Sequence, residues 1–206
     1  AKKAREKVTV VLTGDCADEL FGGYDKYLGK HYAEKYASYP SFVRTIFEKG
    51  VQWIPHNNYT NHTLRKVKKV IKAASLTPEN RYLSLSSLGF QKTEKNDLLN
   101  DTFQEDVSIE ILKQFNSLGI SDELTQTFYS DIHLVLEGDM LAKVDRACMI
   151  NSLEARVPFL DSKIVDFSFK LPHEFKIQGT NKKRILKETF SDLLPEETMN
   201  FSKKGF

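Results

Sequence analysis

The stretch that decides the fold is residues 8–24, VTVVLTGDCADELFGGY. Residues 8–12 are apolar or β-branched and a small turn follows them, a pattern that predicts a buried strand of a parallel sheet. We expect this strand to be the only one in the chain. Because a lone parallel strand lacks partners for its backbone, the sequence predicts a domain that begins upstream of Ala1 and a strand that lies at an exposed edge.

The rest of the chain has the periodicity of helices. A helix is expected from Asp18 to about Tyr39, with a break at Tyr39-Pro40, because a proline disfavours the helical conformation of the residue before it. Residues 60–74 carry apolar side chains at spacings of three and four, and Thr77-Pro78-Glu79 has the pattern of a helix start. Further helices are expected at about 94–100, 106–116 and 121–149. The predicted fold class is mostly α with one short parallel strand.

The charge balance argues against a polyanionic partner. The 206 residues include 30 Lys and Arg against 28 Asp and Glu, a net charge of +2, which is too small to indicate nucleic-acid binding. The basic segment 65–69, RKVKK, is therefore interpreted as a solvated helix face. Cys16 and Cys148 are too few for a disulfide scaffold, and no apolar run has the length of a signal peptide or a membrane span. We expect a cytoplasmic protein that binds neither nucleic acid nor a membrane.

Three carboxylates follow the predicted strand within five residues, namely Asp15, Asp18 and Glu19. In open α/β sheets, ligands bind outside the carboxyl ends of the strands. Carboxylates at such a place can hold magnesium that bridges phosphate oxygens, or accept a proton from a nucleophile. The alternative is that Asp15 and Asp18 only cap the helix that begins there. Spacing alone favours neither interpretation.

A second charged segment covers residues 139–146, DMLAKVDR, and 152–161, SLEARVPFLD. Its charged residues are interleaved with apolar ones, which predicts ion pairs packed near the core. By pattern alone, most of this segment is structural.

Together these segments resemble the synthetase domain of glutamine-hydrolysing asparagine synthetase. The first motif is T-G-D-x-A-D-E-L-F-G-G-Y at 13–24, and the second combines D-M-L-x-K-x-D-R with S-L-E-x-R-V-P-F-L-D. A third motif follows in the same order, with KRILK at 183–187, Leu194-Pro195 and KKGF at 203–206. The resemblance covers nearly the whole chain. Residues 76–82, LTPENRY, are more similar to the microbial three-motif branch than to the animal or enteric type.

The resemblance implies that residues 1–206 are part of an α/β domain of the ATP-pyrophosphatase type, similar to the adenine nucleotide alpha hydrolases. The implied cofactors are ATP and Mg²⁺, and ATP would adenylate the side-chain carboxylate of aspartate. Ammonia that a separate glutaminase domain releases from glutamine would then displace AMP. A homodimer is an assembly compatible with this resemblance.

The phosphate loop of the family, Ser-Gly-Gly-x-Asp-Ser, occurs nowhere in the 206 residues. Neither does the glutaminase domain with its N-terminal catalytic cysteine, and both are expected upstream. Because backbone N–H groups of a glycine-rich turn hold the pyrophosphate of ATP, we expect the chain alone to have no synthetase activity. Gly22-Gly23 is expected to serve close packing rather than to replace that turn.

Roles carry over to the residues that match the motifs. Thr13 and Gly14 would line the adenosine side of the nucleotide pocket, where a small residue lets the backbone approach a ligand. Asp15 would orient or deprotonate the incoming ammonia, and Asp18 would lie near magnesium and pyrophosphate. Lys183 would offset the charge that develops as pyrophosphate leaves. We expect Asp15, Asp18 and Lys183 to meet in one cleft.

Three other motif positions have less direct roles. Glu154 and Arg156 are expected to form walls of the site rather than to react. Cys16 stands where the motif usually has glycine, and a positive φ at this position is harder for cysteine to adopt. A nucleophilic role for Cys16 is disfavoured because no histidine lies near it in sequence and the family chemistry needs no thiol.

Other functions remain open at this point. One is a related amidotransferase that acts on a different carboxylate, for example in the modification of cell-surface polysaccharides or peptides. The β-lactam synthetases are more distant, and they place tyrosine where Asp15 stands. A helical interaction domain without catalysis is an alternative of another class, against which the retention of Asp15, Asp18 and Lys183 argues.

Overall fold

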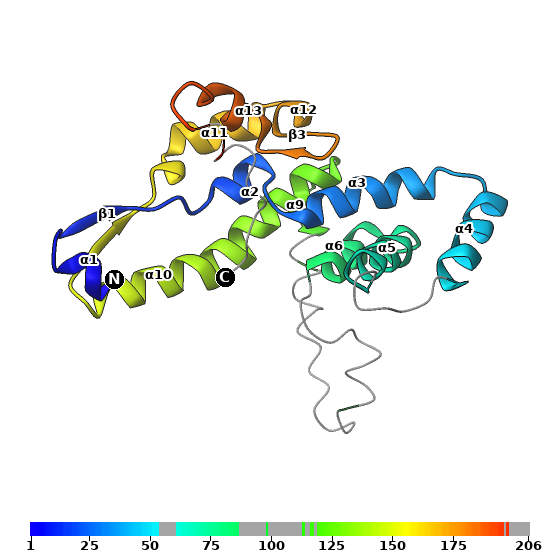
Figure 1. Cartoon of the computed structure of the whole chain (residues 1–206), viewed down its shortest axis with the longest axis horizontal. Coiled ribbons are helices and arrows are strands. Elements are labelled where there is room, and N and C mark those ends of the chain that lie inside the picture. The colour runs from blue at the N-terminus through cyan, green and yellow to red at the C-terminus, as the bar shows by residue number, and fades with distance from the viewer. Residues whose placement is uncertain are drawn as a thin grey trace. The chain divides into compact units, whose positions relative to one another are not determined.

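The computed structural model describes residues 1–53, 61–86 and 119–195, together with positions 98, 113, 116, 117 and 197. The chain divides into two compact units (Figure 1). Unit 1 is Ala1–Tyr24 with Phe128–Phe206, and unit 2 is Asp25–Thr127. The described residues are mostly helical, as predicted, and none of their helices is long and apolar enough to cross a membrane.

Unit 1 contains a parallel pair of short strands, β1 (Val10–Leu12) and β2 (Glu154–Arg156). Leu12 lies opposite Arg156, and the N–H of Thr13 donates to the Arg156 carbonyl at 2.9 Å just beyond the end of β1. The prediction of a single strand without a partner was therefore wrong, because β2 supplies a parallel neighbour from within the chain.

A second pair of strands forms an antiparallel hairpin in unit 1. It consists of β3 (Ile177–Gln178) and β4 (Asn181–Lys182), and Gly179 in its turn has a φ of 58°, a conformation that glycine adopts readily. The described residues thus hold four strands in two separate sheets. Strands of two or three residues are too short to show the alternation of apolar and polar residues that predicts a strand from sequence.

The first strand lies at an exposed edge, as predicted, but the buried strand that its apolar pattern indicated is not observed. The side chains of Val10 and Leu12 in β1 are 39% and 72% exposed, and Val8 just before them is 44% exposed. β1 thus has one paired side and apolar side chains in solvent.

Unit 1 contains several short helical elements. They are α1 (Lys2–Arg5), α2 (Ala17–Phe21), the 3₁₀ turn η3 (Pro158–Leu160), α11 (Ser162–Lys170), α12 (His173–Lys176) and α13 (Arg184–Thr189). α2 contacts α11 and α13, which lie above it in Figure 1. Its Leu20 and Phe21 form the core of the unit with Cys16 and Leu136. Burial of these side chains fixes α2 on the unit.

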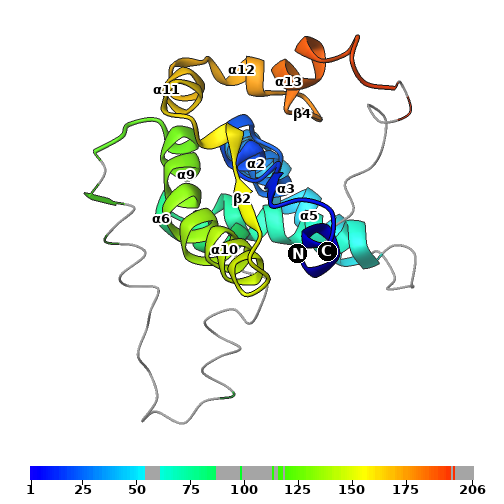
Figure 2. The same cartoon turned by 90° about the vertical axis from the view of Figure 1, so that its left-hand side faces the viewer.

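A continuous helical stretch covers residues 123–149. It consists of α9 (Glu123–Asp131), the π-helix η2 (Ile132–Leu141) and α10 (Ala142–Met149). The helix predicted over 121–149 is therefore confirmed in extent, although apolar spacing gave no sign of the wider π geometry in its middle. Figure 2 shows α10 beside β2, and the two elements are in contact.

Unit 2 packs its helices around small side chains. They are α3 (Asp25–Ala37), α4 (Ser41–Trp53), α5 (Asn61–Ala74) and α6 (Pro78–Ser86). Ala33, Ala73 and Ala74 are buried, with Val70 and Leu85 packed against them. Small residues allow α3 and α5 to approach closely, and the larger side chains of Tyr27 and Leu64 on these helices are also buried.

The predicted boundaries in this region are mostly confirmed. α5 matches the expected helix over 60–74, α6 begins at Pro78, and the chain breaks between α3 and α4 at Pro40. The single helix expected from Asp18 to Tyr39 was wrong, because a turn at Gly22-Gly23 divides it into α2 and α3. The helices expected at about 94–100 and 106–116 lie outside the continuously described residues.

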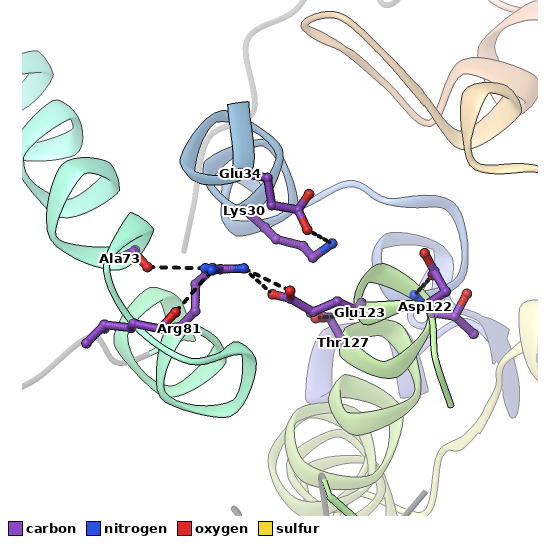
Figure 3. A network of polar contacts seen from close by, with 9 residues as sticks. Lys30, Glu34, Ala73, Arg81, Asp122, Glu123 and Thr127 are labelled. Carbon is purple, nitrogen blue, oxygen red and sulfur yellow. Dashed lines mark hydrogen bonds and ion pairs between the residues drawn. The ribbon is translucent and has the colours of Figure 1, made fainter. Parts of the chain in front are cut away.

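Arg81 is buried in unit 2 and joins α5, α6 and the start of α9 (Figure 3). Its Nη1 lies 2.9 and 2.8 Å from the two carboxylate oxygens of Glu123. Its Nε donates to the carbonyl of Ala73 at 3.1 Å, and Nη2 donates to that of Leu76 at 3.0 Å. Carbonyls at a helix end lack intrahelical donors, so Arg81 satisfies the end of α5 while it binds the first residue of α9.

Candidate active site

The chain enters the site from β1 through a tight turn. Residues 13–16 connect β1 to α2, and Cys16, directly before the helix, has φ 71° and ψ −18°, in the left-handed region. The position that is usually glycine in the motif thus keeps a glycine-like backbone although a cysteine occupies it. This conformation costs a side-chain-bearing residue about 1 kcal/mol. Burial of the Cys16 side chain against Leu20 and Leu136 offsets that cost.

Cys16 has the environment of a core residue rather than of a nucleophile. It is 1% exposed, and burial, with smaller effects of the Glu19 and Asp15 charges, raises the pKa of its thiol to about 12. Since the thiolate is the reactive species, the thiol is inert at neutral pH. The preference for a structural Cys16 is supported.

The structure brings Asp18 and Lys183 together. The Lys183 Nζ lies 2.9 Å from Oδ1 of Asp18, and the two side chains are 31% and 23% exposed. Asp18 is in the first turn of α2, while Lys183 directly precedes α13 with a left-handed φ of 53°. Asp15 is partly exposed in the turn before α2, three residues ahead of Asp18. Of the three residues predicted to converge, Asp18 and Lys183 are in contact, whereas the convergence of Asp15 with them in one cleft stays a prediction.

Glycines make room for this ion pair. The N–H of Gly23 donates to the Asp18 carbonyl at 2.9 Å, and a Cβ added at Gly23 would overlap both Oδ1 of Asp18 and Cε of Lys183. At Gly22, where φ is 72°, an added Cβ would lie 2.6 Å from Cγ1 of Ile177. The expectation that these glycines serve close packing is confirmed at both positions.

A buried acid and a tyrosine lie behind the ion pair. Tyr24 Oη donates to Oε1 of Glu19 at 2.6 Å, and Glu19 is 1% exposed. Burial raises the pKa of Glu19, the bond from Tyr24 opposes this shift, and the charges of Asp18 and Asp131 add to it. Burial and the bond to Glu19 also raise the pKa of Tyr24.

Glu154 and Arg156 are the first and last residues of β2, which pairs with β1. Their side chains pair with each other at 2.7 Å and are 54% and 66% exposed. Lys143, Asp145 and Arg146 are also exposed. The prediction of ion pairs packed near the core was therefore wrong for these positions, because the charged side chains point to solvent and only the residues between them are covered. What Arg156 supplies to the site is its backbone carbonyl, which fixes Thr13.

The family model for asparagine synthase matches residues 1–206. The chain belongs to the asparagine synthase family. It is 29% identical over 220 residues to asparagine synthetase 1 of Bacillus subtilis and 31% identical over 210 residues to a putative asparagine synthetase of Mycobacterium tuberculosis, both glutamine-hydrolysing by name.

These matches cover 100% of this chain but 32% and 30% of the two relatives. The chain thus spans about a third of the length of the asparagine synthetases that it matches. Amidase chyE of Penicillium rubens is 26% identical over 220 residues, which cover 97% of this chain and 32% of that protein. No solved structure matches.

For a member of this family, the magnesium expected at Asp18 can be tested against the donors present. No group of three or more His, Cys, Asp or Glu residues that could hold a metal occurs in the described part of the chain. Magnesium in nucleotide sites uses one or two carboxylates, with phosphates and waters as the other ligands. Asp18 could supply one such carboxylate, although its Oδ1 pairs with Lys183 in this structure.

The sequence reasoning missed the pairing of Glu19 and Tyr24. The sequence motifs assign no role to Glu19 or to Tyr24. The signal was present, since an acid and a tyrosine stand on either side of Gly22-Gly23, where the turn can bring them together.

Proposed function

We propose that this chain is the part of an ATP-dependent asparagine synthetase that places charged side chains around the phosphates of ATP while aspartate is adenylated. The observation that carries the proposal is the 2.9 Å contact between Lys183 and Asp18. The two residues come from different motifs of the asparagine synthase family, which matches the whole chain. Two opposite charges, both partly open to solvent, are what a magnesium-bound triphosphate needs.

Each residue has a distinct task in this proposal. Lys183 offsets the negative charge that grows on pyrophosphate as it leaves. Asp18 would hold magnesium, which would neutralise phosphate oxygens and so favour attack of the aspartate carboxylate on the α-phosphorus of ATP. Asp15, in the turn before α2, orients ammonia or takes a proton from it during the second step. Glu154 and Arg156 form the wall on the β2 side.

Thr13 and Gly14 face the adenosine in this account. The Thr13 hydroxyl oxygen is buried and has no hydrogen-bond partner in the described part of the chain, so it is ready to bind a polar group of a ligand. An added Cβ at Gly14 would meet no atom within 4 Å, which leaves space for a ligand beside the backbone.

The complete reaction needs parts beyond these residues. We propose an ATP-pyrophosphatase fold for the parent domain, ammonia from glutamine hydrolysed in a separate domain, and AMP and pyrophosphate as products. Without a Ser-Gly-Gly-x-Asp-Ser loop in its sequence, the 206-residue chain by itself is expected to be inactive, even with ammonium in place of glutamine.

Amidation of another carboxylate is the second candidate. Relatives named as amidases, chyE and chry2, are 26% and 24% identical to this chain, each over 97% of its length. The same charged residues can serve either acceptor, because they act on ATP rather than on the carboxylate.

Exchange of labelled pyrophosphate into ATP tests the proposal and separates the two candidates. The complete protein would be assayed with magnesium and, in turn, aspartate, glutamate, succinate and short peptides. Exchange that depends on aspartate supports asparagine synthesis. Exchange with another carboxylate alone supports the second candidate, and no exchange with any acid would contradict both.

A further inference from the structure

We infer that Glu19 and Tyr24 are positioning residues, whose hydrogen bond fastens the Gly22-Gly23 turn and thereby holds Asp18 against Lys183. The inference concerns how the ion pair is kept in place, and its consequence for catalysis rests on the proposed function. Neither residue needs to touch a substrate in this role.

The chain reverses its direction after α2. The helix ends at Gly22, whose backbone is left-handed, and the chain then turns back so that Tyr24 reaches Glu19. Two bonds fasten this return. The N–H of Gly23 donates to the Asp18 carbonyl at 2.9 Å, and Tyr24 Oη donates to the Glu19 carboxylate at 2.6 Å.

The neighbouring carboxylates of Asp18 and Glu19 have different partners. Asp18 and Glu19 are consecutive on α2, so their side chains leave the helix about 100° apart. Asp18 is partly exposed and pairs with Lys183, whereas Glu19 is 1% exposed and pairs with Tyr24. One carboxylate is therefore open to a ligand while its neighbour anchors the same turn of helix from inside.

The backbone of Gly23 has no free space beside it. Its backbone lies so close to the ion pair that even a methyl group there would overlap Asp18 Oδ1 and Lys183 Cε. A shift of the Gly23 backbone therefore changes the space in which both side chains are held. Tyr24, the next residue, constrains that position through a partly buried bond to Glu19, and hydrogen bonds shielded from water are stronger than exposed ones.

Substitutions of Tyr24 and Glu19 distinguish the effect of their hydrogen bond from the effect of the Glu19 charge. Tyr24→Phe removes the hydroxyl and keeps the ring. Glu19→Met removes the acceptor at similar volume without leaving a buried charge unpaired, which keeps the test informative where Tyr24→Phe folds poorly. Glu19→Gln keeps a carbonyl oxygen for the tyrosine. Tyr39→Phe, at a tyrosine that is 45% exposed, is the matched control.

The direct readout is the acetylation of Lys183 by trace acetic anhydride in the complete protein, measured by mass spectrometry against exposed Lys163 as an internal reference. An amine held against a carboxylate is attacked more slowly than a free one. We expect Tyr24→Phe and Glu19→Met to raise the Lys183 to Lys163 ratio about threefold or more, and Glu19→Gln and Tyr39→Phe to leave it near the wild-type value.

Pyrophosphate exchange is measured on the same variants. A raised ratio together with kcat lowered about tenfold or more at a little-changed KM for aspartate supports both the positioning role and the proposed function. A raised ratio with unchanged exchange supports the positioning role but contradicts the use of Lys183 in adenylation. An unchanged ratio in folded Tyr24→Phe or Glu19→Met overturns the inference.

Discussion

The ammonium of Lys183 lies 2.9 Å from the carboxylate of Asp18, although the two residues come from opposite ends of the chain. α2 brings Asp18 to this place from the end of β1, and the β3–β4 hairpin brings Lys183 to the start of α13. The core around Leu20 and Phe21, which includes residues that precede and follow the hairpin, holds the two segments together. The fold of unit 1 thus creates a charged pair that neither segment contains alone.

Gly23→Ala is predicted to destabilise unit 1 and to separate this pair. The added methyl group overlaps Asp18 and Lys183 side-chain atoms, and overpacking of this kind costs about 1–3 kcal/mol. Gly50→Ala is the matched control, because Gly50 lies in α4 with nothing within 4 Å of its added Cβ. The control should be neutral or stabilising by about 0.5–1 kcal/mol. Urea unfolding of both variants measures the difference, and equal effects would contradict the packing role of Gly23.

Cys16 is predicted to make the protein less stable at alkaline pH. The thiol pKa rises from 9.0 to about 12 on burial. Below pH 9 the thiol is protonated in both states, but between pH 9 and 12 only the unfolded chain releases the proton. The free energy of unfolding therefore falls as pH rises through that range, by at most about 1.4 kcal/mol per pH unit.

Urea unfolding at pH 8, 9 and 10 tests this with Cys16→Ala, which keeps a side chain at the left-handed position but has no proton to lose. The variant should show the smaller decline between pH 9 and 10. An identical decline in both proteins would show that the Cys16 thiol does not contribute.

The sequence was sufficient for the elements whose pattern is local. Apolar spacing located α5, proline located the starts of α4 and α6, and the β-branched run at residues 8–12 located β1. It was not sufficient for β2, since Glu154 and Arg156 alternate with one small residue over only three positions. β2 forms by pairing with β1, and neither segment alone has a pattern that predicts this pairing.

In the candidate site, too, the sequence identified some residues but not the contacts between them. Motifs named Asp18 and Lys183, but their contact depends on packing across the whole of unit 1. The pairing of Tyr24 with Glu19 depends on a left-handed Gly22 that reverses the chain, whereas periodicity extended one helix through this turn. The motif raised the question of a positive φ at Cys16, and the structure shows that Cys16 adopts it.

Arg81→Ala is predicted to destabilise unit 2 by up to about 3–5 kcal/mol, because it leaves the Glu123 carboxylate, whose side chain is only 15% exposed, without its partner. Replacing both residues by Met should cost less than the single change, since no buried charge then remains. Lys66→Ala, which breaks an exposed ion pair with Asp25, should cost no more than about 1 kcal/mol.

Hydrogen exchange at the end of α5 provides a local measurement for these variants, because Arg81 binds the carbonyls of Ala73 and Leu76 there. Amides of this region should exchange faster in Arg81→Ala than in Lys66→Ala. Equal protection in the two variants would be inconsistent with the role of Arg81 at the helix end.

The most direct test of the account is the aspartate-dependent exchange of pyrophosphate into ATP by the complete protein carrying Lys183→Ala. Lys163→Ala, which removes an exposed lysine of α11 in the same unit, is the control. We predict that Lys183→Ala lowers the exchange rate by about 10²–10³-fold, that Lys163→Ala stays within about twofold of wild type, and that glutamine hydrolysis is nearly unchanged in both. Wild-type exchange by Lys183→Ala, or an equal loss of exchange and glutamine hydrolysis, would contradict the assignment of Lys183 to adenylation.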